Sequence, residues 1–245
     1  MTTIQVLDTQ GVRVLTFNRP EKRNAIDLNM YQQLTEYLIQ GDSDNGIGAF
    51  LLCGNQDCFT SGNDVAEFLQ HPDLGPEHPA VRFLYCLTEL KKPLLAAVSG
   101  SAVGIGTTLL LHCDLVYADD SARFKMPFVD LSLIPEAGAT MLLPRLTGYQ
   151  KAAELLLLGN SFDARQACEY GLVNQVLPGP ELTDFALQQA SIIAAKPPQA
   201  VQQTKALMRM GKADLQQQMQ RELDCFAKQL QSPKAKEMFL KFLQR

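Results

Sequence analysis

Residues 91–118 read KKPLLAAVSGSAVGIGTTLLLHCDLVYA and combine an apolar strand, a glycine-rich turn and an apolar helix. The strand is expected over Leu94–Ser99, after a proline that favours extended geometry. Gly100, Gly104 and Gly106 then let the backbone take positive φ and approach a ligand closely. Because the first N–H groups of the following helix have no partner within it, this corner is a candidate site for a negatively charged oxygen.

Two other interpretations of this stretch are weaker. The run 94–111 is long enough for a membrane-spanning helix, but glycines, serines and threonines interrupt it and Lys91, Lys92 and Asp114 flank it. The glycine spacing, Gly-xxx-Gly-x-Gly, matches neither the dinucleotide-binding nor the P-loop pattern. We therefore expect a buried strand, turn and helix, and no membrane association.

Composition narrows the classes of partner. A net charge of −4 and an isoelectric point near 5.4 leave no electrostatic footprint for nucleic acid, so small molecules or copies of the chain are the expected partners. The cysteines and histidines have no spacing typical of a metal site, and we expect none. The N-terminal MTTIQVLDTQGV lacks a targeting signal and the C-terminal FLQR is not an SKL-type peroxisomal address. The expected compartment is the cytoplasm.

A second turn with the same organisation lies earlier in the chain. Ala49–Cys53 is fully apolar, as is typical of a strand buried on both faces of a sheet. The segment Phe59–Phe68, FTSGNDVAEF, follows it and opens a helix that Asp64 can cap. Two such turns can aim two backbone N–H groups at one oxygen atom.

Glu136 is the third candidate. It is a lone carboxylate in IPEAGAT, residues 134–140, where its neighbours are apolar or small. One interpretation makes it a solvated charge at a helix N-terminus, helped by the helix dipole, and the segment alone favours that interpretation. The other makes it a base in an apolar pocket.

The rest of the chain indicates an α/β fold. Strands and helices alternate up to about residue 177, and mostly helical sequence follows. The loop His71–Pro79 has three prolines and is expected to be mobile near the mouth of the site. The other predicted elements are a hairpin of Ile4–Leu7 and Val12–Phe17, helices from Asp27 and over 80–90, 149–158 and 164–170, strands over 123–126 and 172–177, and C-terminal helices over 180–195, 199–210, 214–231 and 233–243.

A family resemblance covers essentially the whole chain. The motifs that carry it, in this order, are NRPEKRNAI (18–26), FTSGNDVAEF (59–68), VSGSAVGIGTTLLLHCDLVYA (98–118), IPEAGAT (134–140), GYQKAAELLLLG (148–159) and ARQACEYGLV (164–173). Together they resemble the crotonase (enoyl-CoA hydratase/isomerase) superfamily. The resemblance implies a crotonase-like (ClpP/crotonase) fold of repeated ββα units, an acyl-CoA ligand, and homotrimers or homohexamers. It implies no metal or redox cofactor, since the coenzyme A thioester is the substrate.

The resemblance also implies a division of the chain and a set of site residues. Residues 1–190 would form the ββα core with the acyl-CoA site, and 191–245 a C-terminal helical subdomain that packs subunits together and covers the substrate. The oxyanion hole would use the backbone N–H groups of Asn63 and Ile105. The implied CoA-binding residues are Lys22, Asn24, Ala25, Ser61, Gly62, Asn63, Asp64, Val65, Gly104 and Gly106, with Lys22 near the CoA phosphates and Lys205 as a further phosphate candidate.

Departures from the family pattern indicate the reaction. Hydratases of this superfamily use two glutamates, whose positions here hold Thr108 and Phe128. Glu136 falls where the enoyl-CoA isomerases carry their single catalytic glutamate. The sequence therefore most resembles the monofunctional Δ3,Δ2-enoyl-CoA isomerases of fatty acid β-oxidation. Phe128, Leu133 and Ile134 are expected to surround Glu136 and raise its pKa.

Several alternatives stay open at this point. The nearest is another crotonase-type reaction, either isomerisation of a ring-containing acyl-CoA or hydration of an enoyl-CoA. A non-catalytic acyl-CoA-binding oligomer, with Glu136 as a solvated charge, is the alternative from another class. A serine hydrolase is disfavoured, because Ser99 or Ser101 would need a placed histidine.

Overall fold

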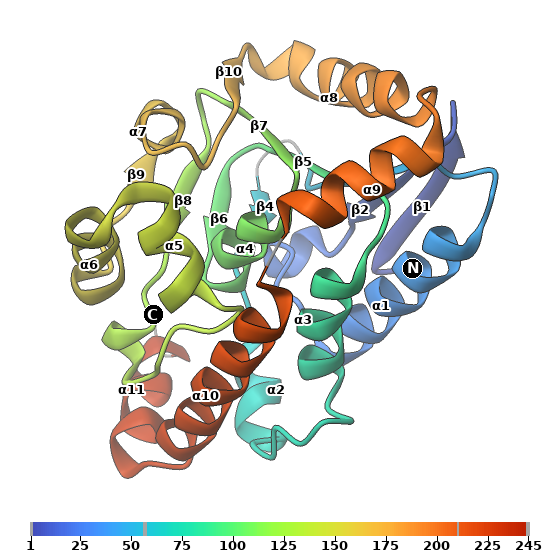
Figure 1. Ribbon diagram of the computed structural model, residues 1–245. Helices are drawn as coiled ribbons and strands as arrows, with labels where there is room; N and C mark the ends of the chain where they lie inside the picture. Colours follow the sequence, from blue (N-terminus) through green and yellow to red (C-terminus); the bar gives the residue numbers. More distant parts are fainter. Residues whose placement is uncertain (1, 56–57, 210, 244–245) are drawn as a thin grey trace.

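The computed structural model describes residues 2–55, 58–209 and 211–243, and its strands form two sheets (Figure 1). The larger sheet runs in the order β1 (Ile4–Thr9), β2 (Val12–Phe17), β3 (Ala49–Cys53), β5 (Leu94–Val98), β7 (Leu115–Asp119) and β10 (Gln175–Leu177). The smaller one runs β4 (Cys58–Thr60), β6 (Ser101–Val103), β8 (Arg123–Lys125) and β9 (Phe162–Asp163). The β1–β2 hairpin and the β8–β9 pair are antiparallel, and the other pairs are parallel.

A unit of two strands and a helix repeats along the chain. In the pairs β3–β4, β5–β6 and β7–β8, the first strand joins the larger sheet and the second joins the smaller one. The helical segments that follow the three pairs are α2 (Val65–Gln70) with α3 (Pro79–Glu89), α4 (Ile105–Thr108) with η2 (Leu109–His112), and η3 (Val129–Leu131) with α5 (Ala139–Thr147) and α6 (Tyr149–Leu158). This repetition confirms the ββα architecture predicted above.

The central strands are apolar because both of their faces are covered. Alternate residues of a strand point to opposite faces: Phe50 and Leu52 of β3 belong to the main core cluster, while Leu51 and Cys53 belong to a second cluster under helix α8 (Gly179–Ala194). Each leucine buried in this way contributes roughly 1.5–3 kcal/mol. The prediction of a strand buried on both faces is confirmed.

The remaining helices lie around these layers. They are η1 (Pro20–Lys22), α1 (Leu28–Ser43), α7 (Ala164–Glu169), α9 (Pro198–Met208), α10 (Lys212–Leu230) and α11 (Pro233–Leu243). The predicted cap by Asp64 is present: its side chain accepts a hydrogen bond from the first turn of α2. The side chains of Asp27 and Asp163 cap α1 and α7 in the same way. Among the described residues, none of the helices has the length and apolar character needed to cross a bilayer.

Two predicted elements differ from the structure for reasons of pairing. The segment 101–103, predicted as part of the glycine-rich turn, is strand β6, because it pairs in parallel with β4 and β8. Strand β10 begins at Gln175 rather than Leu172, since the N–H groups of Leu172 and Val173 both donate to the carbonyl of Ala167 at the end of α7. Met210, the predicted end of the helix over 199–210, lies outside the described residues, and the boundary at residue 190 stays a prediction.

Candidate active site

The two glycine turns leave neighbouring strands and touch each other. Strand β4 pairs with β6, so the segments 61–64 and 103–106 emerge side by side. A Cβ on Gly62 would lie 2.8 Å from the carbonyl oxygen of Val103, and one on Gly106 would lie 2.5 Å from Cγ2 of Thr60. Gly62 also has a φ of +97°. The glycines are therefore required for the contact between the turns as well as for their conformation.

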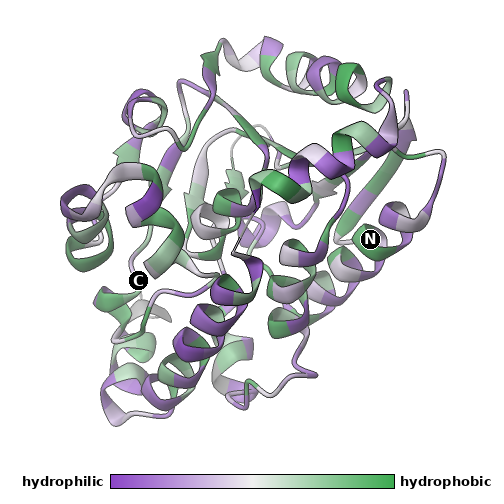
Figure 2. Ribbon diagram, viewed as in Figure 1, coloured by the Kyte–Doolittle hydropathy of each residue, from purple (hydrophilic) through white to green (hydrophobic). Residues whose placement is uncertain are grey.

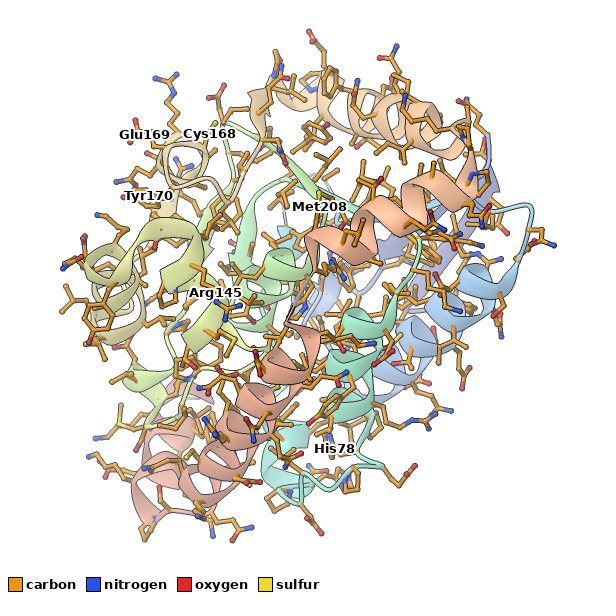
Figure 3. All side chains as sticks on the ribbon, viewed as in Figure 1. His78, Arg145, Cys168, Glu169, Tyr170 and Met208 are labelled. Atoms are coloured by element: carbon orange, nitrogen blue, oxygen red, sulfur yellow. The ribbon has the colours of Figure 1, made fainter. Side chains whose placement is uncertain are left out.

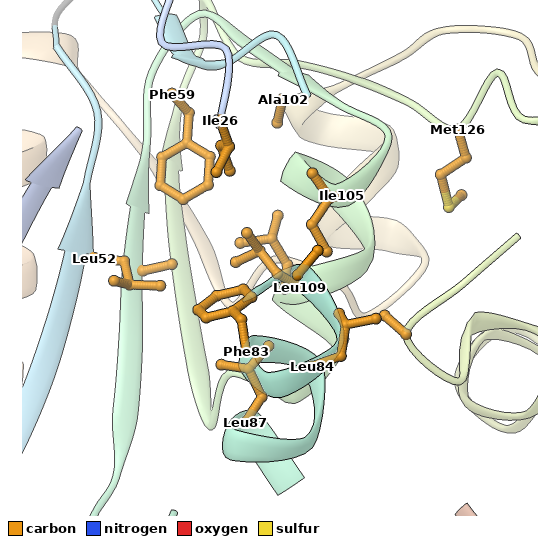
Figure 4. Packing of buried hydrophobic residues seen from close by; sticks show 14 of the residues in the cluster. Ile26, Leu52, Phe59, Phe83, Leu84, Leu87, Ala102, Ile105, Leu109 and Met126 are labelled. Atoms are coloured by element: carbon orange, nitrogen blue, oxygen red, sulfur yellow. The ribbon is translucent and has the colours of Figure 1, made fainter. Parts of the chain in front are cut away.

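Asn63 and Ile105 each present a backbone N–H at these turns. Within the part of the chain that the structure describes, neither N–H donates a hydrogen bond, whereas that of Asp64 donates to Ile26 and that of Gly104 to Lys125. The side chain of Ile105 packs into the core near Phe83, Leu84 and Leu109 (Figure 4). That packing fixes the turn, and both residues line one cavity of about 310 Å³.

The large cavity gathers most of the predicted CoA-binding residues. Those on its wall are Lys22, Ala25, Ser61, Gly62, Asn63, Asp64, Val65 and Gly104. Asn24 and Gly106 are absent from it. Asn24 is fully buried and its Nδ2 donates to the carbonyl of Cys58 at 2.8 Å, so its side chain supports strand β4. Phe226 of α10 and Phe239 of α11 line the cavity as well, and the C-terminal helices thus cover the site in part.

Arg19 holds the loop 18–26 against the SGND turn. Its Nη1 donates to Oδ2 of Asp64 at 2.9 Å and to the carbonyl of Ala25 at 3.0 Å. The sequence analysis did not predict this contact. The ion pair is half-buried and ties together two stretches of the cavity wall that are far apart in sequence.

Glu136 is buried, with only 5% of its surface exposed. The hydroxyl of Thr108 donates to its Oε1 at 2.5 Å. Burial raises the pKa of Glu136 to about 8; the Thr108 hydrogen bond lowers that pKa and the charge of Glu222 raises it. The interpretation of Glu136 as a solvated helix charge is therefore wrong, and a carboxyl that can take up and return a proton near neutral pH fits the structure.

Glu136 lines a second cavity, of about 20 Å³, which shares Asn63, Phe68 and Phe226 with the large one. The rest of its wall is apolar apart from Tyr31: Leu74, Ala80, Val81, Leu84 and Leu223. Of the three residues expected around Glu136, Phe128 and Leu133 line the large cavity instead, and Ile134 lines neither. The apolar wall beside Glu136 comes mainly from α3 and α10, which are remote in sequence.

Tyr31 lies at the site and was not among the predicted site residues. Its hydroxyl donates to Oδ1 of Asn63, and its ring lines the small cavity. Burial and the nearby Glu136 raise the pKa of the phenol well above its usual value. A tyrosine on an apolar helix face needs a partner for its hydroxyl, and that need was the available signal.

Lys205 is not free to bind phosphate, contrary to the prediction. It is 3% exposed, and its Nζ donates to the carbonyl of Lys92 at 2.6 Å and to Oδ2 of Asp114 at 2.7 Å. An ammonium buried in this way is already paired. Its role is to hold α9 against the strands.

His112 is a core residue whose ring has a hydrogen-bond partner. It is buried, and its Nε2 lies 2.7 Å from the carbonyl oxygen of Ala137. Burial lowers its pKa to about 4, so the ring is neutral near pH 7 and Nε2–H donates to that carbonyl.

The connection between α2 and α3 borders the site. Leu74 lines the small cavity, and His78, at the start of α3 (Figure 3), packs edge-on against Phe68 with 5.7 Å between ring centroids. The predicted position of this loop near the site agrees with these contacts. Its mobility stays a prediction.

The sequence and the fold are similar to those of known proteins. The profile of the family described as Enoyl-CoA hydratase/isomerase matches residues 8–245. Enoyl-CoA delta isomerase 2 of Homo sapiens is 36% identical over 214 residues, or 84% of this chain, which spans about half (54%) of that relative. The 1,2-epoxyphenylacetyl-CoA isomerase of Escherichia coli (strain K12) is 41% identical over 198 residues, 77% of this chain and 74% of the relative. The solved structure of Pseudomonas aeruginosa OdaA has a TM-score of 0.97, 41% identity and 100% coverage of both chains.

Proposed function

Because the chain belongs to the enoyl-CoA hydratase/isomerase family, we propose that it is an isomerase that converts a 3-enoyl-CoA to the trans-2-enoyl-CoA. One observation carries the proposal: among the described residues, Glu136 is the one carboxyl that lines the small cavity, and this cavity shares Asn63 with the cavity lined by the two N–H groups. The resemblance to isomerases supports the same assignment. The relatives include isomerases and a 2,3-dehydroadipyl-CoA hydratase of Escherichia coli, so they support the family and not one of its reactions.

The two N–H groups act on the thioester oxygen. In a 3-enoyl thioester the C2 protons are acidified by both the carbonyl and the double bond, and removing one gives a dienolate. With the carbonyl oxygen between the N–H groups of Asn63 and Ile105, negative charge develops where two donors already point. One such donor is typically worth about 3 kcal/mol in the transition state.

Glu136 moves the proton. As a carboxylate it takes one proton from C2, and as a carboxylic acid it returns that proton to C4, so that the double bond shifts with no net change in composition. A positioned base of this kind adds roughly 10²–10⁴-fold to the rate. The raised pKa of Glu136 suits both half-reactions, because neither protonation state is strongly favoured near pH 8.

Water addition is disfavoured by the residues at the two hydratase positions. The hydroxyl of Thr108 donates a hydrogen bond to Glu136. Phe128 is part of the wall of the large cavity and is apolar. Neither supplies a second carboxylate to place and activate a water molecule. A hydratase is therefore the runner-up.

A ring-containing substrate is a second candidate, favoured by the 41% identity to a phenylacetyl-CoA-type isomerase. The cavity beside Glu136 has a volume of about 20 Å³, close to that of one water-sized probe. It is too small for either a linear acyl chain or a ring, so turnover decides between the two candidates.

The rest of the proposal concerns substrate binding and setting. The CoA moiety would lie along the large cavity with its phosphates near Lys22, and no cofactor beyond the CoA thioester is needed. We further propose a cytoplasmic homotrimer or homohexamer that serves fatty acid β-oxidation.

The test is turnover of 3-hexenoyl-CoA and 2-hexenoyl-CoA by wild type and Glu136→Gln. We expect wild type to form the conjugated 2-enoyl product without hydrating it, and the variant to lose isomerisation while still binding CoA thioesters. Glu154→Gln, an exposed carboxylate of α6, is the matched control. Hydration of 2-hexenoyl-CoA that persists in Glu136→Gln would contradict the isomerase assignment. Turnover of a ring-containing acyl-CoA alone would favour the second candidate.

A further inference from the structure

The turn that carries Glu136 has an unusual backbone. Ala137 has a φ of +61° and Gly138 a φ of +71°. Two successive left-handed residues, one of them with a Cβ, are unfavourable for an L-chain and persist only where the surroundings hold them. The direction of the Glu136 carboxyl therefore depends on the hydrogen bonds that hold residues 137 and 138 in this conformation.

Two side chains hold this turn by hydrogen bonds. Nε2 of His112 donates to the carbonyl of Ala137. The carboxylate of Glu222 accepts hydrogen bonds from the N–H of Gly138 at 2.7 Å, from the N–H of Thr140 at 3.0 Å, and from the Thr140 hydroxyl. Glu222 is 3% exposed and so binds the N-terminus of α5 away from water.

Helix α10, which carries Glu222, also closes the small cavity. A Cβ on Gly138 would lie 2.5 Å from Cδ1 of Leu215. Since Leu215 belongs to α10, this helix packs directly against the turn. On that helix, Leu223 and Phe226 line the cavity of Glu136. The outward side of α10 is mostly hydrophilic (Figure 2), as expected of a helix with one buried face.

We propose that Glu222 is a positioning residue for the base: by binding the N–H groups of Gly138 and Thr140, it fixes the Glu136 carboxyl at the small cavity. This inference rests on the proposed function of Glu136. A purely structural cap on α5 would stabilise the fold without affecting proton transfer. Glu222 does more, because the residues it holds are adjacent to the base and no other described side chain accepts from the N–H of Gly138.

The test compares Glu222→Ala and Glu222→Gln with Asp224→Asn, an exposed carboxylate on the same helix. For Glu222→Ala we expect kcat for 3-hexenoyl-CoA to fall about 10- to 100-fold with KM within about threefold, because a displaced base slows chemistry rather than binding. Glu222→Gln keeps one acceptor and should lie between. Glu222→Gln should also shift the acid limb of kcat/KM to lower pH, because it removes a negative charge that raises the pKa of Glu136. The other titratable groups near the base among the described residues, Tyr31 and the neutral His112, are unchanged in this variant.

A second readout separates this inference from the proposed function. Deuterium exchange at the amides of residues 137–140 should speed up in both Glu222 variants and stay at the wild-type rate in Asp224→Asn. If wild type does not isomerise 3-hexenoyl-CoA, the proposed function fails and the exchange data alone decide whether Glu222 holds the turn. Should Glu222→Ala not fold, Glu222→Gln decides. Unchanged kcat, pH limb and exchange in a folded variant would overturn the proposal.

Discussion

The two N–H groups of the site and its carboxyl are positioned in different ways, the first by the backbone and the second by side chains. The N–H groups of Asn63 and Ile105 belong to backbone turns at the ends of paired strands, held by glycines and by the core. The Glu136 carboxyl belongs to a strained turn, held by side chains from η2 and α10. The first side depends on where the chain runs, and the second on which side chains arrive from elsewhere. Substitutions that displace the backbone should therefore affect the N–H groups, and substitutions that remove a side-chain contact should affect Glu136.

Gly62→Ala should have the largest effect, because it displaces the backbone itself. Its Cβ would clash with the carbonyl of Val103, and a φ of +97° is unfavourable for alanine. We expect isomerisation to fall about 10²–10³-fold, as when an oxyanion donor is lost. Gly75→Ala, with nothing within 4 Å of the added Cβ, is the matched control. Equal activity of the two variants would contradict the proposed contact between the turns.

The pH dependence of wild type should report the base. Glu136 is active as a carboxylate and its pKa is raised to about 8, so the protonated, inactive form dominates below that pH. We expect kcat/KM to rise about tenfold per pH unit from pH 6 and to level off above pH 8. The measurement is initial rates of 3-hexenoyl-CoA isomerisation across that range. A plateau that already begins near pH 5 would mean that Glu136 is not the titrating base.

Thr108→Val should have a smaller effect, on the side-chain half only. The substitution keeps the shape of the residue but removes the hydrogen bond that lowers the pKa of Glu136. The acid limb of kcat/KM should move to higher pH, with a loss of about tenfold at pH 7, as expected for one buried hydrogen bond. Glu136→Gln is the reference, because a variant without the carboxyl at this position should show no acid limb in kcat/KM. An unshifted limb in Thr108→Val would show that the hydroxyl does not act on the base.

Ile105→Val should have the smallest effect. It alters the side chain of a proposed oxyanion donor and leaves the donating N–H in place, apart from one methylene in the core. We expect kcat to stay within about threefold of wild type and the free energy of unfolding to fall by about 1 kcal/mol, measured by kinetics and urea titration. A loss as large as that of Gly62→Ala would contradict the idea that this side is made of backbone alone.

The same contrast explains what the sequence revealed. The turns at Gly62 and Gly104 could be predicted because strand, glycine and helix cap are local patterns. The ββα order and the position of Glu136 came from the family resemblance. The partners of Glu136 could not be predicted: Glu222 lies 84 residues from the Gly138 that it binds, and on α10 it is one charge among many. Lys205 failed for the same reason, since its pairing with Asp114 depends on how α9 packs.

The contact between Thr108 and Glu136 separates control of the proposed base from binding of the thioester. The hydroxyl of Thr108, at a position that the family resemblance assigns to a hydratase glutamate, donates a hydrogen bond to the carboxyl of Glu136. The proposed oxyanion donors are backbone N–H groups and do not depend on a side chain. We therefore expect the residue at position 108 to adjust the protonation of the base without changing the part of the site that is proposed to hold the thioester.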